Sequence, residues 1–88
     1  MKDQVVKTNY KIAVALLRQE KFDEAVLVLL EVVKLDPGHF KAFSNLGVAY
    51  KNLKRIKEAG LSFERALKLK PGSPEVYNNL GNVYTAME

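Results

Sequence analysis

Small and apolar side chains recur every three to four positions along the chain, which is the spacing of a helix with one buried face. The pattern is clearest in two segments, whose small or apolar members are Phe43, Leu46, Gly47 and Tyr50, and then Ala59, Phe63, Ala66 and Leu67. The spacing predicts five helices, at residues 4–19, 22–35, 40–52, 56–69 and 74–87. The connections at 19–21 and 53–55 are short, so we expect the helices on either side of each to lie antiparallel.

Turn residues stand where the helical pattern breaks. Pro37–Gly38 and Pro71–Gly72 follow the second helix of each pair, and such residues are typical of helix ends. Ser73, Pro74 and Glu75 then provide an N-cap, a first-turn proline and an acidic side chain favourable at a helix N-terminus. The last helix is therefore predicted to begin at this point.

The chain repeats itself after 34 residues. Placing residues 74–88 over 40–54 aligns two sets of identical residues, which are Asn45, Leu46, Gly47 and Tyr50, and Asn79, Leu80, Gly81 and Tyr84. A fixed period of this length indicates an array in which each unit buries its apolar face against its neighbours. We expect one domain over residues 1–88, with repeats at about 6–39 and 40–73 and a half repeat at about 74–88.

The middle unit carries a specific set of spacings, namely Phe43-x2-Leu46-Gly47-x2-Tyr50, Ala59-x3-Phe63, Ala66 and Pro71. This set resembles the tetratricopeptide repeat (TPR) family. The resemblance implies an all-α fold, a short right-handed α-solenoid of antiparallel helix pairs that binds proteins and is not an enzyme. The first unit departs from the pattern at Asn9, Ala13, Leu16, Leu29 and Val32. We therefore expect its packing to be looser, or adapted to an end of the array.

Composition excludes several kinds of chemistry. Without cysteine there is no disulfide framework, thiol nucleophile or cysteine-ligated metal site. His39 is the only histidine and lies in a turn, so we interpret it as a turn or cap residue and expect no catalytic site, metal or cofactor. The longest apolar stretches, Ile12–Leu17 and Ala25–Leu30, are too short to cross a membrane or to form a signal peptide, so a cytoplasmic location is expected.

Small residues on the helix faces have a mechanical interpretation. Gly47 and Gly81 leave no side chain, so neighbouring helices are expected to approach closely there. Glycine costs roughly 0.5–1 kcal/mol relative to alanine inside a helix, so a packing reason is needed. The pattern offers none for Gly60, which is interpreted as a weak point of its helix.

The resemblance places a binding groove on the first helix of each pair, where an extended peptide would lie. Its predicted residues are Asn45, Asn79, Lys11, Lys41, Asn82, Tyr10, Ser44, Val48 and Asn52. The equivalent Asn45 and Asn79 are similar to the asparagine ladder of O-linked N-acetylglucosamine transferases, because a carboxamide can pair with any peptide bond. The alternative is that an asparagine before Leu-Gly is consensus filler, common in such repeats whatever they bind.

A second binding mode of the family, the carboxylate clamp for acidic C-terminal tails, is disfavoured. It requires fixed cations and asparagines at defined places. Those places hold Tyr10, Val14, Asn45, Glu75 and Asn79, of which only Asn45 fits.

Charge is uneven, since residues 40–73 carry eight basic and two acidic side chains within a net charge of +4. Basic residues gather near the turns between paired helices, at Lys51, Lys54, Arg55, Lys57, Arg18 and Lys21. A solvated edge is preferred over nucleic-acid contact, because the aromatic residues are already assigned to packing.

The last helix has more apolar positions than one covering helix can bury. Those expected to form an open face are Val76, Leu80, Val83 and Met87. Either further repeats or a second copy of the chain would cover this face, so a homodimer through the terminal helix is the alternative function.

Overall fold

The computed structural model describes residues 1–88 as five α-helices without strands. The helices are α1 (Lys2–Arg18), α2 (Phe22–Leu35), α3 (Phe40–Asn52), α4 (Ile56–Leu69) and α5 (Pro74–Met87). Four of the five predicted ranges agree with these bounds. The first helix begins two residues earlier and ends one residue earlier than the predicted 4–19.

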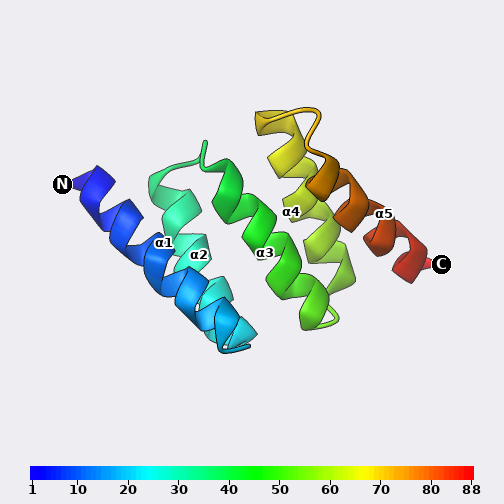
Figure 1. Ribbon diagram of the computed structural model, residues 1–88, viewed down its shortest axis with the longest axis horizontal. Coiled ribbons are helices and arrows are strands. Elements are labelled where there is room, and N and C mark those ends of the chain that lie inside the picture. The colour runs from blue at the N-terminus through cyan, green and yellow to red at the C-terminus, as the bar shows by residue number, and fades with distance from the viewer.

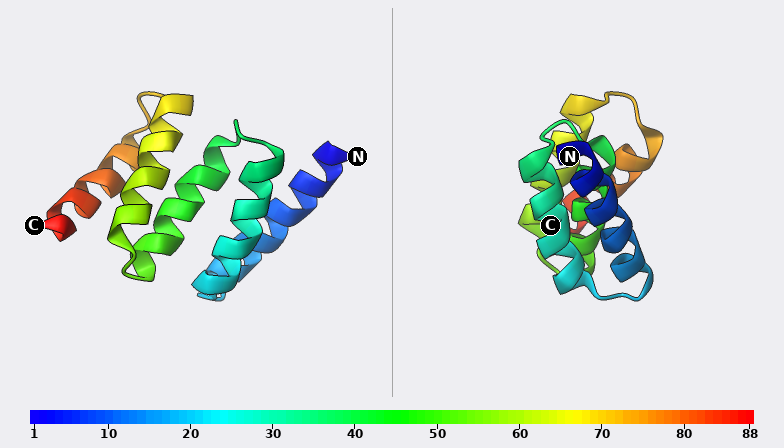
Figure 2. Two further views of the ribbon diagram at one scale, coloured as in Figure 1. Left: turned by 180° about the vertical axis from the view of Figure 1, so that it is seen from behind. Right: turned by 90° about the vertical axis from the view of Figure 1, so that its left-hand side faces the viewer.

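The helices alternate between two layers, with α1, α3 and α5 in one layer and α2 and α4 in the other (Figure 1 and Figure 2). Each helix packs against its neighbours in sequence, and α3 also contacts α5. The result is a short right-handed α-solenoid, 43 × 27 × 17 Å in extent. None of the five helices combines the length and the apolarity needed to cross a bilayer.

The hairpins inside the two helix pairs close in the same way. Glu20 and Lys54, which are 34 residues apart, have φ angles of 58° and 65°. In both hairpins the amide of the next residue donates to a carbonyl five residues back, at 2.9 Å. A left-handed conformation costs about 1 kcal/mol or more for a residue with a side chain, so the capping bonds and the helix packing hold it in place.

Side-chain caps start the first helix of each later unit. The Nδ1 atom of His39 accepts a hydrogen bond from the backbone N–H of Ala42 at 3.1 Å, so the histidine is a cap residue as predicted. Ser73 caps α5 in the same position, its Oγ accepting from the N–H of Val76 at 3.5 Å, and Pro74 follows in the first turn. Both caps satisfy amides that the helix itself leaves unpaired.

The core of the second pair is built around Gly47. A Cβ atom at this position would lie 2.5 Å from Cε1 of the fully buried Phe63 ring. The missing side chain therefore makes room for an aromatic ring from α4. The atoms nearest to Gly47 belong to this ring and not to the backbone of a neighbouring helix.

The first pair fills the equivalent places with different residues. Ala13 replaces the glycine and Leu29 replaces the phenylalanine, and both are completely buried, as is Val32. A larger residue on one helix is matched by a smaller one on the other, which preserves the volume of the core. The departures from the family pattern are thus adapted packing, not looser packing.

Two expectations about glycine were wrong. Gly60 has a packing role, because its Cβ would lie 3.4 Å from Cγ1 of Val83 and 3.6 Å from Cε of Met87, both on α5. Gly81 has none here, because no atom lies within 4 Å of the place its Cβ would take. No second helix covers α5 as α4 covers α3.

Candidate functional site

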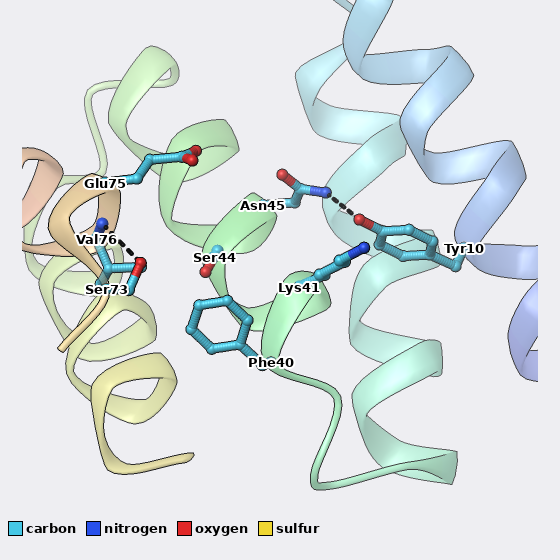
Figure 3. A pocket seen from close by; sticks show the side chains of 8 residues that line it. All are labelled: Tyr10, Phe40, Lys41, Ser44, Asn45, Ser73, Glu75 and Val76. Atoms are coloured by element: carbon cyan, nitrogen blue, oxygen red, sulfur yellow. Dashed lines mark hydrogen bonds between the residues drawn. The ribbon is translucent and has the colours of Figure 1, made fainter. Parts of the chain in front are cut away.

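A cavity of about 250 Å³ lies where α1, α3 and the start of α5 come together. We call it the groove cavity. Its lining residues, shown in Figure 3, are Tyr10, Phe40, Lys41, Ser44, Asn45, Ser73, Glu75 and Val76. A concave site with converging polar groups on an apolar base is the usual form of a binding site.

A hydrogen bond between α1 and α3 fixes two of the polar groups. The Nδ2 atom of Asn45 donates to the Oη atom of Tyr10 at 2.9 Å (Figure 3). The Tyr10 ring also stacks on His39, with ring centroids 4.7 Å apart. Burial raises the pKa of Tyr10, although the bond from Asn45 opposes that rise, so the phenol stays protonated at neutral pH. Its O–H therefore remains a donor, and Oδ1 of Asn45 remains an acceptor.

Ser44 adds an unpaired polar atom to the lining. Its Oγ atom is buried and has no hydrogen-bond partner within the chain. Leaving a buried hydroxyl unpaired costs about 1–3 kcal/mol, and a ligand would reach this atom only after the side chain changes rotamer. Ser44 lies one residue before Asn45 on the same helix, and in Figure 3 its Oγ points towards Phe40 while the carboxamide of Asn45 points towards Tyr10.

The base of the groove cavity is apolar. Phe40 at the start of α3 is half-buried, and Val76 in the first turn of α5 is 1% exposed. The Nζ atom of Lys70 lies 5.3 Å from the centre of the Phe40 ring, within the range of a cation–π contact. An apolar side chain entering the cavity would meet these two residues.

Charges of opposite sign stand on two sides of the cavity. Lys41 extends from α3 towards Tyr10, whereas Glu75 extends from the first turn of α5 (Figure 3). The ion pair formed within the chain is between Arg55 and Glu58, so neither cavity charge is neutralised by a salt bridge. The N-terminus of α5 favours a negative charge at Glu75.

Four of the nine predicted groove residues meet in this cavity, and five do not. Asn79 on α5 accepts a hydrogen bond at its Oδ1 from Nζ of Lys51 on α3 at 3.1 Å. Asn52 donates to the carbonyl of the half-buried Val48 on its own helix at 2.9 Å. Lys11 and Asn82 are exposed and line no cavity. The predicted residues outside the groove cavity are Asn79, Asn52, Val48, Lys11 and Asn82.

Four lining residues are not among the nine predicted groove residues, namely Phe40, Ser73, Glu75 and Val76. Of these, Glu75 was considered for binding only as an unsuitable residue at a carboxylate-clamp position. All four lie at or just before the first turn of a helix. The sequence signal at these positions was local, a cap and a charge at a helix start, and it did not reveal that the start of α5 lies beside the start of α3.

The predicted open face of α5 is mostly closed. Val76, Leu80 and Val83 are 1%, 7% and 0% exposed, because they form the face that packs into the core. Of the four expected residues, Met87 alone is exposed, at 52%. The expectation that they form one open face was therefore wrong. The large side chains that α5 does expose are Tyr77, Tyr84 and Met87.

The basic edge is partly occupied by contacts within the chain. Two nitrogens of Arg55 donate to the same oxygen of Glu58, with Nη2 at 2.7 Å and Nε at 3.0 Å from Oε2. The guanidinium also lies 5.1 Å from the centre of the Tyr50 ring. This pairing raises the pKa of Arg55 and lowers the pKa of Glu58, because each partner stabilises the charged form of the other. Lys51 donates to Asn79, so two of the six basic residues are engaged by contacts within the chain.

A second hollow of about 260 Å³ lies between α2, α3 and α4. It is mainly apolar and is lined by Leu30, Val33, Phe43, Leu46, Tyr50, Glu58, Leu61 and Ser62. It lacks the set of converging hydrogen-bonding groups found around Asn45, and we therefore take the groove cavity as the candidate site.

Two layers of antiparallel helix pairs, repeated every 34 residues and hollowed along the first helices, define a helical-repeat protein of the solenoid class. A family model described as tetratricopeptide repeat matches residues 10–74. The chain belongs to the tetratricopeptide repeat family.

Solved structures agree with this assignment. The structure titled "MamA MSR-1 C2" is 33% identical, with a TM-score of 0.88 over 93% of this chain and 47% of that one. The first TPR of Spaghetti (RPAP3), bound to the HSP90 peptide SRMEEVD, is 33% identical with a TM-score of 0.84, over 85% of this chain and 60% of that one. The first TPR domain of human RPAP3 is 33% identical with a TM-score of 0.82, over 85% of this chain and 59% of that one.

The chain thus spans about half to three fifths of the solved chains it matches. No curated protein matches it significantly.

Proposed function

We propose that the chain is a non-catalytic protein-interaction module that holds an extended peptide segment along α1, α3 and α5. The observation that carries this proposal is the hydrogen-bonding set around Asn45 in the groove cavity. It offers the hydroxyl of Tyr10 as a donor and Oδ1 of Asn45 as an acceptor. A peptide group presents one acceptor and one donor, so it matches this set whatever its side chain.

The bond between Tyr10 and Asn45 prepares the site before a ligand arrives. Both side chains are half-buried and each restrains the other, so little conformational freedom remains to be lost on binding. Of the two asparagines predicted to form a ladder, Asn45 lines the groove cavity, whereas Asn79 lies outside its lining and accepts a hydrogen bond from Lys51.

One of the similar solved structures supports peptide binding in general. The first TPR of Spaghetti (RPAP3) has the peptide SRMEEVD bound to it. In this chain a carboxylate, Glu75, stands at the groove cavity. Glu75 repels an acidic residue placed beside it, so SRMEEVD should bind more weakly than a variant that carries a basic residue at that end.

A peptide array screened with the purified chain, followed by NMR mapping of the strongest peptides, tests the proposal. Amide shifts should change most around Tyr10, Lys41 and Asn45. Asn45→Ala should weaken binding about fivefold, corresponding to the roughly 1 kcal/mol of an ordinary hydrogen bond, while Asn82→Ala serves as the matched control. Shift changes confined to α2 and α4, or equal binding by both variants, would contradict the proposed site.

Self-association is the second candidate, supported by the exposed Tyr77, Tyr84 and Met87 on α5. Sedimentation velocity across a hundredfold range of concentration would detect it. If α5 mediates the contact, Tyr77→Ser should abolish the larger species without unfolding the chain, because Tyr77 is 53% exposed. A monomer at all concentrations excludes this candidate.

A further inference from the structure

We infer that the groove cavity selects its peptide by charge order: an acidic side chain on the α1 side, an apolar side chain in the cavity and a basic side chain on the α5 side. This inference rests on the proposed function and names the class of ligand for the same site. It follows from how charge is divided across the three helices of the groove layer.

The two outer helices of that layer carry opposite charge. Four basic side chains and one acidic side chain lie on α1, whereas α5 has Glu75 as its only charged residue. Lys7 is three positions from Tyr10, so it lies on the helix face that borders the groove cavity, and its side chain is exposed. A peptide crossing from α1 to α5 therefore passes from a positive to a negative surface.

The cavity itself repeats this polarity on a smaller scale. Lys41 points to the α1 side beside Tyr10, and Glu75 stands on the α5 side (Figure 3). Both side chains are exposed and neither has a salt-bridge partner in the chain. Each is therefore free to pair with a ligand, and a side chain of like charge placed opposite either one is repelled.

The apolar part of the lining adds a position for an uncharged side chain. Phe40 is half-buried and can cover one ligand side chain, whereas Val76 is only 1% exposed and contributes little surface. Successive side chains of an extended peptide point to opposite faces, so residues two apart share a face. The ligand pattern is an acidic residue, an apolar residue and a basic residue, each separated by one position.

Four synthetic peptides with the same backbone and a central leucine test this pattern. Their flanking positions carry glutamate and lysine, two glutamates, two lysines or two glutamines. The mixed peptide should bind most tightly, by about threefold for each favourable charge pair, as expected for partly exposed pairs. A nitroxide attached at its glutamate end should broaden the amide of Lys11 on α1, and not that of Asn78 on α5.

Charge reversal in the protein provides the complementary test. Lys41→Glu should move the preference to the peptide with two lysines, and Glu75→Lys to the peptide with two glutamates. The double variant should again prefer the mixed peptide, now with the nitroxide effect on α5. Lys34→Glu and Glu31→Lys, at exposed positions of α2, are matched controls that change net charge equally and should leave the order of preference intact.

The possible outcomes separate this inference from the proposed function. Equal affinity for all four peptides, or the same change in the control variants, would overturn the charge order while leaving peptide binding intact. If no peptide binds the folded chain at millimolar concentration, both the inference and the proposed function fail.

Discussion

Gly47 and Gly81 occupy the same place in successive units, and their surroundings differ completely. At Gly47 the Phe63 ring of α4 fills the space that a side chain would need, whereas at Gly81 nothing lies within 4 Å. The tyrosines one turn later differ in the same direction, since Tyr50 is 8% exposed and Tyr84 is 47% exposed. One motif thus serves a packed core in α3 and an open surface in α5, and the difference is set by the covering helix.

The largest effect should come from removing the residue that fills the covered site. We expect Phe63→Ala to lower the free energy of unfolding by about 3–5 kcal/mol, because a fully buried ring leaves a cavity. Urea denaturation followed by circular dichroism measures this loss. Tyr84→Ala on the open side is the comparison, and a similar loss there would show that α5 is not the less constrained helix.

Filling the covered glycine should have the next largest effect. A Cβ at Gly47 would lie 2.5–2.6 Å from three atoms of the Phe63 ring, so Gly47→Ala should cost about 1–3 kcal/mol. The first pair already combines Ala13 with Leu29 at the equivalent places. Adding Phe63→Leu should therefore make the double variant about 1 kcal/mol more stable than the sum of the single changes predicts. Additive losses in urea denaturation would contradict this account.

Substituting the exposed glycine, Gly81, should change the free energy of unfolding in the opposite direction. Because nothing surrounds its Cβ position, Gly81→Ala should raise the free energy of unfolding by about 0.5–1 kcal/mol through helix propensity. The same urea experiment gives the value. A loss of stability would mean that in solution another element occupies the space beside Gly81.

The smallest effect concerns the bond between Tyr84 and α4. The phenol of Tyr84 donates to Oε2 of Glu64 at 2.8 Å, and this bond to a carboxylate raises the pKa of Tyr84. A raised folded pKa stabilises the native state below the ordinary tyrosine pKa of about 10, and this contribution is lost as pH rises through the folded value. Wild type should therefore lose stability relative to Tyr84→Phe above about pH 10, as followed by thermal melting at successive pH values. Parallel curves would show that the bond does not form in solution.

The helices were predictable because the spacing and capping residues that indicate each helix lie within its own segment of the sequence. Periodicity gave the bounds of four helices, and Ser73 and Pro74 marked the start of α5. The packing partners were harder to predict. The role of Gly60 depends on Val83 and Met87 of another helix, and no spacing within α4 indicates where those side chains lie.

The candidate site was predicted in part for the same reason. Tyr10, Lys41, Ser44 and Asn45 lie on first helices and were expected in the groove, and they line the cavity. Glu75 joins them only because the start of α5 lies beside the start of α3, which is a matter of how consecutive units stack. The division into repeats at 6–39, 40–73 and 74–88 stays a prediction, as does the role of each groove residue.

Contact between neighbours in sequence also determines how the molecule should fold and open. Nearly all packing joins consecutive helices, so folding requires few closures of long loops, and chains of this kind fold in microseconds to milliseconds. Each terminal helix has one main neighbour, while α3 has two and also touches α5. Amide hydrogen exchange should therefore be fastest in α1 and α5 and slowest in α3, so that the array opens from its ends while the centre of the groove keeps its shape.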